Sequence, residues 1–205
     1  MSNPSDGKKP VIADEDYELV CLCQKGDVDA FGPLVEKYQK KMVNIAFRII
    51  GDYEAASEVV QDAFVSAFKA MRKFRGDARF STWLYRIVIN ASRNRMKQLR
   101  TRIQREGISI EGSRDTEDGR GIDPPDPGPS VLEQVEKREV EAKVQACISA
   151  LDDEYREVLV LRDIQGFSYD EISDILKIPD GTVKSRLFRG REALKDGLKK
   201  VLGDL

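Results

Sequence analysis

The chain has 205 residues, of which 40% are hydrophobic and 34% are charged, a composition that supports a packed core beneath a heavily charged surface. Its formal net charge of −2 argues against a general nucleic-acid coating protein, because such proteins are strongly basic. No apolar run is long enough to span a membrane, and the polar start MSNPSDGKKP lacks the apolar core of a signal peptide, so we expect a cytoplasmic protein.

The chain has three cysteines and no histidine. Their sparse spacing offers no tetrahedral zinc site and no disulfide framework, so we expect reduced thiols, no metal and no cofactor.

Residues 14–100 are predicted to form one all-helical domain, preceded by a frayed, disordered tail at residues 1–13. Asp14 is expected to cap a first helix that stops before Gly26. A second amphipathic helix should end at Gly51, and Asp52 should open a third. After a loop at Gly76-Asp77, Ser81 is expected to cap a fourth helix.

A basic block covers residues 72–105, where eleven Lys and Arg accompany a single acid. Within it, the stretch FRGDARFSTWLYRIVINASRN interleaves aromatic side chains with arginines. We expect at least one or two of Phe74, Phe80 and Trp83 to be core residues. One interpretation of the stretch is an amphipathic helix with snorkelling arginines. The other is a surface for nucleic acid, whose bases stack on aromatic rings and whose phosphates attract cations. A loop with aromatics and Gly could also accept a base taken out of the stack.

Residues 101–131 are predicted to be a flexible linker, because residues 106–130 are acidic, rich in Gly and Pro and poor in large apolar groups. Helical periodicity returns at residues 132–205. Ser168 and Glu171 form a capping box, residues 177–180 make a short turn, and a basic last helix begins at Asp180 or Gly181. This pattern is typical of a helix-turn-helix, although the basic charges alone would also fit an ordinary solvated helix. The side chains left for its outer surface are Thr182, Lys184, Ser185, Arg186, Phe188 and Arg189.

The segments DYEAASEVVQDAFVSAF, FRGDARFSTWLYRIVIN and LDDEYREVLVLRDIQGFSYDEISDILKIPDGTVKSRLFRGREALK, in this order, resemble the extracytoplasmic-function (ECF, group 4) sigma factors of the bacterial sigma-70 family, of the sigma-E type. The resemblance covers nearly the whole chain except residues 1–13 and the linker. It implies two small helical domains, sigma region 2 at 14–100 and sigma region 4 at 132–205. It further implies binding to core RNA polymerase and to promoter DNA, in a stress or envelope response controlled by an anti-sigma factor.

The resemblance also assigns residues to three surfaces. The polymerase-binding residues would be Glu58, Val59, Gln61, Asp62, Phe64, Val65 and Phe68. Helical periodicity alone would instead place Val59, Phe64 and Phe68 in the core. The −10 element would be melted and read by Phe74, Arg75, Asp77, Phe80, Trp83, Arg86, Asn90, Arg93 and Asn94. The −35 element would be read by Thr182, Lys184, Ser185, Arg186, Phe188 and Arg189. Ala78, Arg79 and Ser81 vary in the family, which leaves the preferred −10 base open.

Two other classes of protein remain open from the sequence. A plain transcriptional regulator would share the helix-turn-helix, but its sensor domain would not need the aromatic and basic block at 74–97. A metal-dependent nuclease would have to use the acids at 14–16 or at 152–154. These acids are adjacent at predicted helix starts, where they complement the helix dipole, so we do not expect an enzyme.

Overall fold

The computed structural model describes residues 14–106 and 131–203, and every regular element in these ranges is helical. In chain order the helices are α1 (Tyr17–Gln24), α2 (Phe31–Ile50), α3 (Tyr53–Ala70), α4 (Phe80–Glu106), α5 (Val131–Ser149), α6 (Asp153–Leu159), α7 (Tyr169–Leu176) and α8 (Asp180–Leu202). A 3-10 turn at Met71–Lys73 follows α3, and a π-helical turn at Val160–Ile164 follows α6. The all-helical prediction is confirmed, whereas the predicted tail and residues 107–130 of the predicted linker lie outside the described residues.

The first part of the molecule, residues 14–106, is built on α2, α3 and α4, which pack against one another around fully buried apolar side chains. Two predicted helix boundaries are confirmed. Gly51 ends α2 with a φ of +88°, a left-handed conformation that glycine adopts without a steric penalty. Asp52 then caps α3, because its carboxylate accepts a hydrogen bond from the Ala55 N–H at 2.7 Å.

Two other predicted caps are wrong. Helix α1 begins at Tyr17 without a side-chain cap, and α4 begins at Phe80, so that Ser81 lies inside the first turn. The Phe80 N–H donates instead to the Asp14 carboxylate at 2.6 Å. A carboxylate 66 positions away in the chain therefore provides the acceptor that Ser81 was expected to supply.

The second part, residues 131–203, places α6 against α8, with α5 and α7 also packed on α8. Its buried apolar side chains come from all four helices and include Ile148, Val158, Ile172, Val183 and Leu187.

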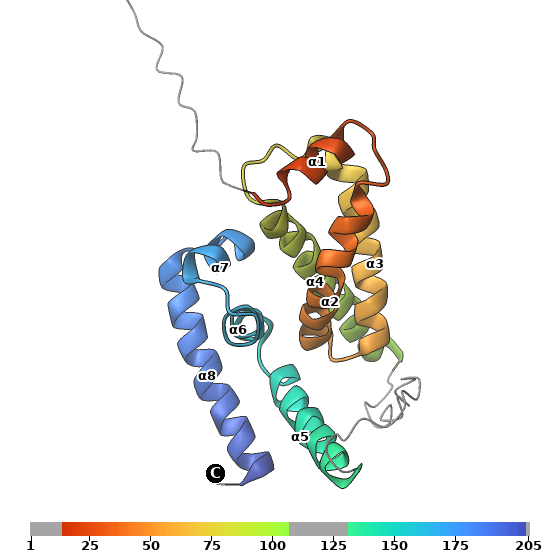
Figure 1. Cartoon of the computed structure of the whole chain (residues 1–205). Coiled ribbons are helices and arrows are strands. Elements are labelled where there is room, and N and C mark those ends of the chain that lie inside the picture. Colours follow the sequence, from red (N-terminus) through yellow and green to blue (C-terminus); the bar gives the residue numbers. More distant parts are fainter. Residues whose placement is uncertain (1–13, 107–130, 204–205) are drawn as a thin grey trace, which may run out of the picture.

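The two parts lie against each other and share one continuous cluster of buried side chains. Figure 1 shows α6 between α8 and the helices of the first part, and α7 lies against α4. At this seam the rings of Tyr85 and Phe167 meet edge to face, with centroids 4.8 Å apart. Two further contacts join α2 to the second part: Arg48 donates to Gln145 at 2.8 Å, and Gln165 donates to Asn44 at 2.9 Å.

Candidate nucleic-acid and protein interfaces

Helices α7 and α8 form the predicted helix-turn-helix. The capping box at the start of α7 is present, since the Glu171 N–H donates to Ser168 Oγ at 3.2 Å and the Ser168 N–H donates to Glu171 Oε2 at 2.8 Å. Lys177 ends α7 with a φ of 57°, which turns the chain sharply into α8. The turn thus presents the first residues of α8 on the outside of the molecule, where a recognition helix needs them.

The outer residues of α8, which we call the α8 surface, are those assigned from the sequence to the −35 element: Thr182, Lys184, Ser185, Arg186, Phe188 and Arg189. Val183 and Leu187 point into the core, whereas Phe188 is 69% exposed, an unusual position for a large aromatic ring. Arg186 is half-buried and forms an ion pair with Glu154 at 2.7 Å. Thr182 is also half-buried, and the exposed members of the surface are Lys184, Ser185, Phe188 and Arg189. Cationic, hydroxyl and aromatic side chains on one exposed helix face can contact phosphates, base edges and thymine methyl groups.

The aromatic residues at the start of α4 form a cluster that is only partly accessible. Phe80 is completely buried, with its ring centroid 6.0 Å from that of Tyr38, 6.2 Å from Phe74 and 5.8 Å from Trp83. Phe80 is therefore a core residue in this structure, as was expected for at least one of Phe74, Phe80 and Trp83, and it offers no accessible surface to a base. Phe74 and Trp83 are half-buried, with ring centroids 5.0 Å apart, and Arg75 and Asp77 are exposed.

The polar face of α4 contacts the second part of the molecule. Arg86 donates to the Asp174 carbonyl of α7 at 2.9 Å, and Arg93 forms a two-pronged ion pair with Glu157 of α6. The hydrogen bond with Glu157 raises the pKa of the Arg93 guanidinium above its ordinary value. Asn90 accepts a hydrogen bond from Arg93 at 3.2 Å, and Asn94 is exposed. Arg86 and Arg93 are thus already bonded to α7 and α6.

A cleft of about 540 Å³ runs between α4, α6 and α8 beside this contact. Its lining includes Asn94 and Lys97 from α4, Glu154 from α6 and Arg186 from α8. Within the described residues, no group of three or more Cys, Asp or Glu is placed to hold a metal ion.

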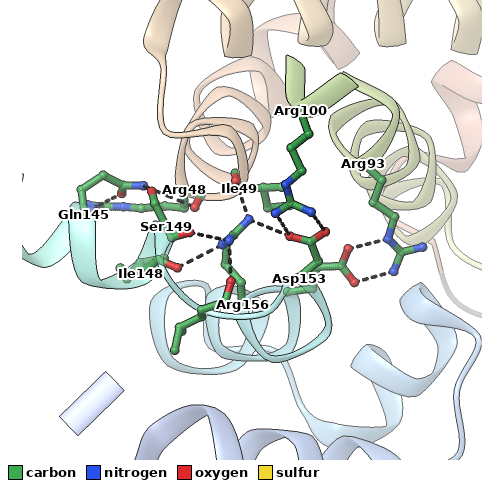
Figure 2. Close-up of polar contacts among 11 residues, drawn as sticks. Arg48, Ile49, Arg93, Arg100, Gln145, Ile148, Ser149, Asp153 and Arg156 are labelled. Atoms are coloured by element: carbon green, nitrogen blue, oxygen red, sulfur yellow. Dashed lines mark hydrogen bonds and ion pairs between the residues drawn. The ribbon is translucent and has the colours of Figure 1, made fainter. Parts of the chain in front are cut away.

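Arg156 is the centre of the polar network that joins the two parts, as Figure 2 shows. Its side chain is 1% exposed and donates to the carbonyls of Ile148, Ser149 and Leu151 and, across the seam, to the Ile49 carbonyl at 3.1 Å. Burial lowers the pKa of the Arg156 guanidinium, although the nearby charge of Asp153 opposes this effect. Sequence reasoning missed Arg156, because nothing in the segment EYREV distinguishes a buried arginine from a solvated one.

Asp153 links this network to α4. Its carboxylate accepts two hydrogen bonds from Arg100, at 2.7 and 2.8 Å, and a third from Arg156 at 3.1 Å. Burial alone would raise the pKa of Asp153, but the arginines outweigh it and lower that pKa. The acids at residues 152–154, considered in the sequence as catalytic candidates, thus include one that holds the two parts together.

The residues assigned to polymerase binding divide into two groups on α3. Val59 and Phe64 are each 7% exposed and belong to the core, so they offer little accessible surface to a partner in this structure. Their positions follow from the helical period, which turns them away from solvent, and the Phe31 ring of α2 meets that of Phe64. The remaining residues are exposed on the outer face of α3, which we call the α3 surface: Glu58, Gln61, Asp62, Val65 and Phe68. Glu58 forms an ion pair with Arg95 at 3.0 Å.

The structure therefore has the features of a helical DNA-binding protein: a helix-turn-helix with an exposed recognition surface and a second basic helix. Two family models match the chain, "Sigma-70 region 2" at residues 34–102 and "Sigma-70, region 4" at residues 141–194. The RNA polymerase sigma-H factor of Pseudomonas aeruginosa is 37% identical over 190 residues, which cover 92% of this chain and 96% of the relative. The ECF RNA polymerase sigma-E factor of Escherichia coli K12 is 34% identical over 187 residues, covering 91% and 96% of the two chains. The chain belongs to the ECF sigma factors of the sigma-70 family, a family of non-catalytic proteins.

Solved structures share the fold. The structure of CnrH in complex with the cytosolic domain of CnrY matches with a TM-score of 0.66 and 26% identity, and the match covers 91% of this chain and 99% of that chain. The sigma factor RpoE of Bartonella quintana, in complex with the anti-sigma factor NepR, matches with a TM-score of 0.63 and 24% identity over 84% of this chain and 98% of that chain. Among the described helices, none has the length and apolar composition of a membrane span.

Proposed function

We propose that this chain binds core RNA polymerase and directs it to promoters that carry −35 and −10 elements. The observation that carries the proposal is the α8 surface. Lys184, Ser185, Phe188 and Arg189 are exposed together at the start of the second helix of a helix-turn-helix, while Val183 and Leu187 anchor that helix from behind. These side chains offer two cations, a hydroxyl and an aromatic ring on one exposed face, the groups that contact phosphates, base edges and thymine methyl groups.

In this proposal the two parts divide the work. Residues 132–205 read the −35 element through the α8 surface, and residues 14–100 bind polymerase through the α3 surface and open and read the −10 element. The −10 residues in this proposal are accessible in the structure or become accessible when α6 and α7 move away from α4: Phe74, Arg75, Asp77, Trp83, Arg86, Asn90, Arg93 and Asn94. Residues 101–131 connect the two parts. The place of action is the cytoplasm, where promoter DNA and polymerase are found.

The packed arrangement adds a condition. Arg93 cannot hold a phosphate while both prongs of its guanidinium are bound to Glu157, and Arg86 is likewise bound to Asp174. Promoter binding by α4 therefore requires that α6 and α7 move away from it. Binding of core polymerase to the α3 surface, which lies outside this seam, is compatible with such a movement.

We also propose that an anti-sigma factor regulates the chain, in a stress or envelope response. The support is the likeness to CnrH, a protein whose structure was solved with the cytosolic domain of CnrY.

The function is tested by transcription with bacterial core polymerase on genomic fragments enriched by the wild-type holoenzyme. We expect defined transcripts only when chain and core are combined. Arg189→Ala should reduce transcription strongly, whereas Lys195→Ala, which removes an exposed cation further along the same helix, should have little effect. Specific binding of the chain to DNA that core polymerase does not change would instead support a plain regulator.

A further inference from the structure

We propose that α1 braces the segment at residues 71–80, which we call the loop, and that Gln24 and Asp14 are positioning residues for promoter opening. The inference rests on the proposed function, because it assigns a role in melting to the loop. It adds α1, in which the sequence assigns no polymerase-binding or DNA-binding residue and which lies before the region 2 match at residues 34–102.

Gln24 holds the beginning of the loop. Its side-chain amide donates to the Phe74 carbonyl at 2.7 Å and to the Met71 carbonyl at 3.3 Å. These bonds span about 50 positions of sequence and fix the point where the chain leaves the 3-10 turn after α3. A side-chain amide carries two N–H donors, so a single residue can hold both carbonyls.

Asp14 holds the end of the loop. One oxygen of its carboxylate accepts the Phe80 N–H at 2.6 Å, and the other accepts the Asp16 N–H at 3.1 Å. The first of these bonds fixes the first turn of α4, where backbone N–H groups lack partners within the helix. The fully buried Phe80 ring reinforces this anchor from the inside.

The brace is itself firmly attached to α2. Asp16 is 1% exposed, and its carboxylate binds Lys37 at 2.5 Å and also the Tyr38 hydroxyl. Val20 and Cys23 are buried on the inner face of α1. A shift of α1 would therefore break the hydrogen bonds of the buried Asp16 carboxylate, so α1 can hold Gln24 and Asp14 in fixed positions.

With both ends held, the loop forms a preformed arch. Arg75, Gly76, Asp77 and Arg79 are exposed along it, and Gly76 has a φ of +70° that other residues rarely adopt. A site that is already ordered does not lose the conformational entropy of ordering when it captures a base. The brace should therefore favour the step in which a base leaves the stack, and it should contribute little to the first encounter with duplex DNA.

The brace can be tested in the free chain without any assumption about function. Hydrogen–deuterium exchange in Gln24→Ala and in Asp14→Ala should be faster at residues 71–80 and unchanged in the middle of α2 and α3. The matched controls, Gln39→Ala on α2 and Glu18→Ala on α1, remove exposed side chains and should leave the loop unaffected. Unchanged exchange at residues 71–80 in both test variants would overturn the brace.

The positioning role is tested with holoenzyme on the enriched promoter fragments. Each test variant should lower permanganate reactivity of the −10 thymines by about fivefold, the effect of losing roughly one net hydrogen bond. The affinity for core polymerase and the affinity for the closed promoter should stay within about twofold of wild type, a change in binding free energy well below the contribution of one hydrogen bond. A general loss of fold would instead reduce all three measurements together, which would overturn a specific role. Normal opening despite faster exchange would overturn it as well. If the wild-type chain opens no promoter, the proposed function fails, and the exchange experiment still decides whether the brace exists.

Discussion

Both carboxylate oxygens of Glu157 accept hydrogen bonds from the Arg93 guanidinium, although 64 positions separate the two residues in the chain. The Glu157 side chain is only 4% exposed, whereas that of Arg93 is 40% exposed. In the packed state, an arginine that we assign to promoter DNA is thus bound to a buried carboxylate. The two partners for Arg93 exclude each other, so this ion pair is the most direct place to perturb the balance between packed and DNA-bound forms.

Glu157→Gln should shift that balance toward DNA. The substitution removes the negative charge but keeps the size of the side chain, and Arg93 is exposed enough to be rehydrated. We expect the full chain to expand in small-angle scattering and to bind promoter duplex roughly fivefold more tightly, equivalent to about 1 kcal/mol. Glu192→Gln, on the exposed side of α8, is the matched control. An unchanged radius and affinity would show that this pair does not restrain the DNA-binding face.

Arg156→Met should destabilise the molecule by about 2–4 kcal/mol, because several buried carbonyls lose their donor at once. Arg156→Lys should restore only part of this, since an ammonium group lacks the planar, five-donor geometry of the guanidinium. Urea unfolding of the full chain measures both changes. Equal stability of wild type and Arg156→Met would mean that apolar packing of the methionine replaces the network fully.

The seam should weaken in alkali. Burial, with a smaller contribution from the charge of Glu171, raises the pKa of Tyr85 to about 12. In the unfolded chain this hydroxyl ionises near its ordinary pKa of about 10. Its contribution to stability is therefore fully present below pH 10 and is lost as the pH rises toward 12, on the order of 2 kcal/mol in all.

Tyrosinate absorbance of wild type minus that of Tyr85→Phe isolates this titration. We expect a late-ionising group in the difference spectrum and a flatter alkaline decline in the stability of the variant. Ionisation of Tyr85 at its ordinary pKa would mean that the hydroxyl is open to water in solution.

The α3 surface should be needed for polymerase but not for folding. Gln61→Ala combined with Val65→Ala should weaken binding to core polymerase while helicity and unfolding midpoint stay unchanged, because both side chains are exposed. Phe64→Ala should instead cost about 3–5 kcal/mol of stability, as expected for a buried aromatic ring. Normal core binding by the double variant would remove α3 from the polymerase interface.

Asn90 offers a test of base reading on α4. Its side chain is exposed, and its amide oxygen already accepts a bond from Arg93. Asn90→Ala should relax the preference at one −10 position, at a cost of roughly 1–3 kcal/mol for the favoured base only. Transcription from a set of single-base −10 variants measures this. A uniform loss on all templates would indicate a role in positioning, and not in reading.

Helical periodicity and local caps predicted the order of the helices, since these signals lie within a few residues of one another. The Ser168–Glu171 capping box and the Gly51 stop are examples. The wrong assignments involve partners distant in sequence. Asp14 caps α4 across 66 positions, and nothing near Ser81 indicates that it would be displaced. The family pattern assigned Phe64 and Phe80 to interfaces, but tertiary packing buries both rings. The contact of α4 with α6 could not be predicted from local sequence either, because it joins charges on opposite sides of the predicted linker.

Arg156 lies where two helix ends meet: α5 ends at Ser149 and α2 at Ile50, so its guanidinium faces carbonyls at both carboxyl ends. Such ends carry partial negative charge, and a cation there is favourable. Three of its four carbonyl partners belong to the second part and only the Ile49 carbonyl belongs to the first. If the parts separate, Arg156 keeps most of its bonds, and water can take over the single one that is broken. The contact between the parts is thus asymmetric. The second part keeps its internal hydrogen bonds to Arg156 when it separates, so opening and reclosing need not involve refolding.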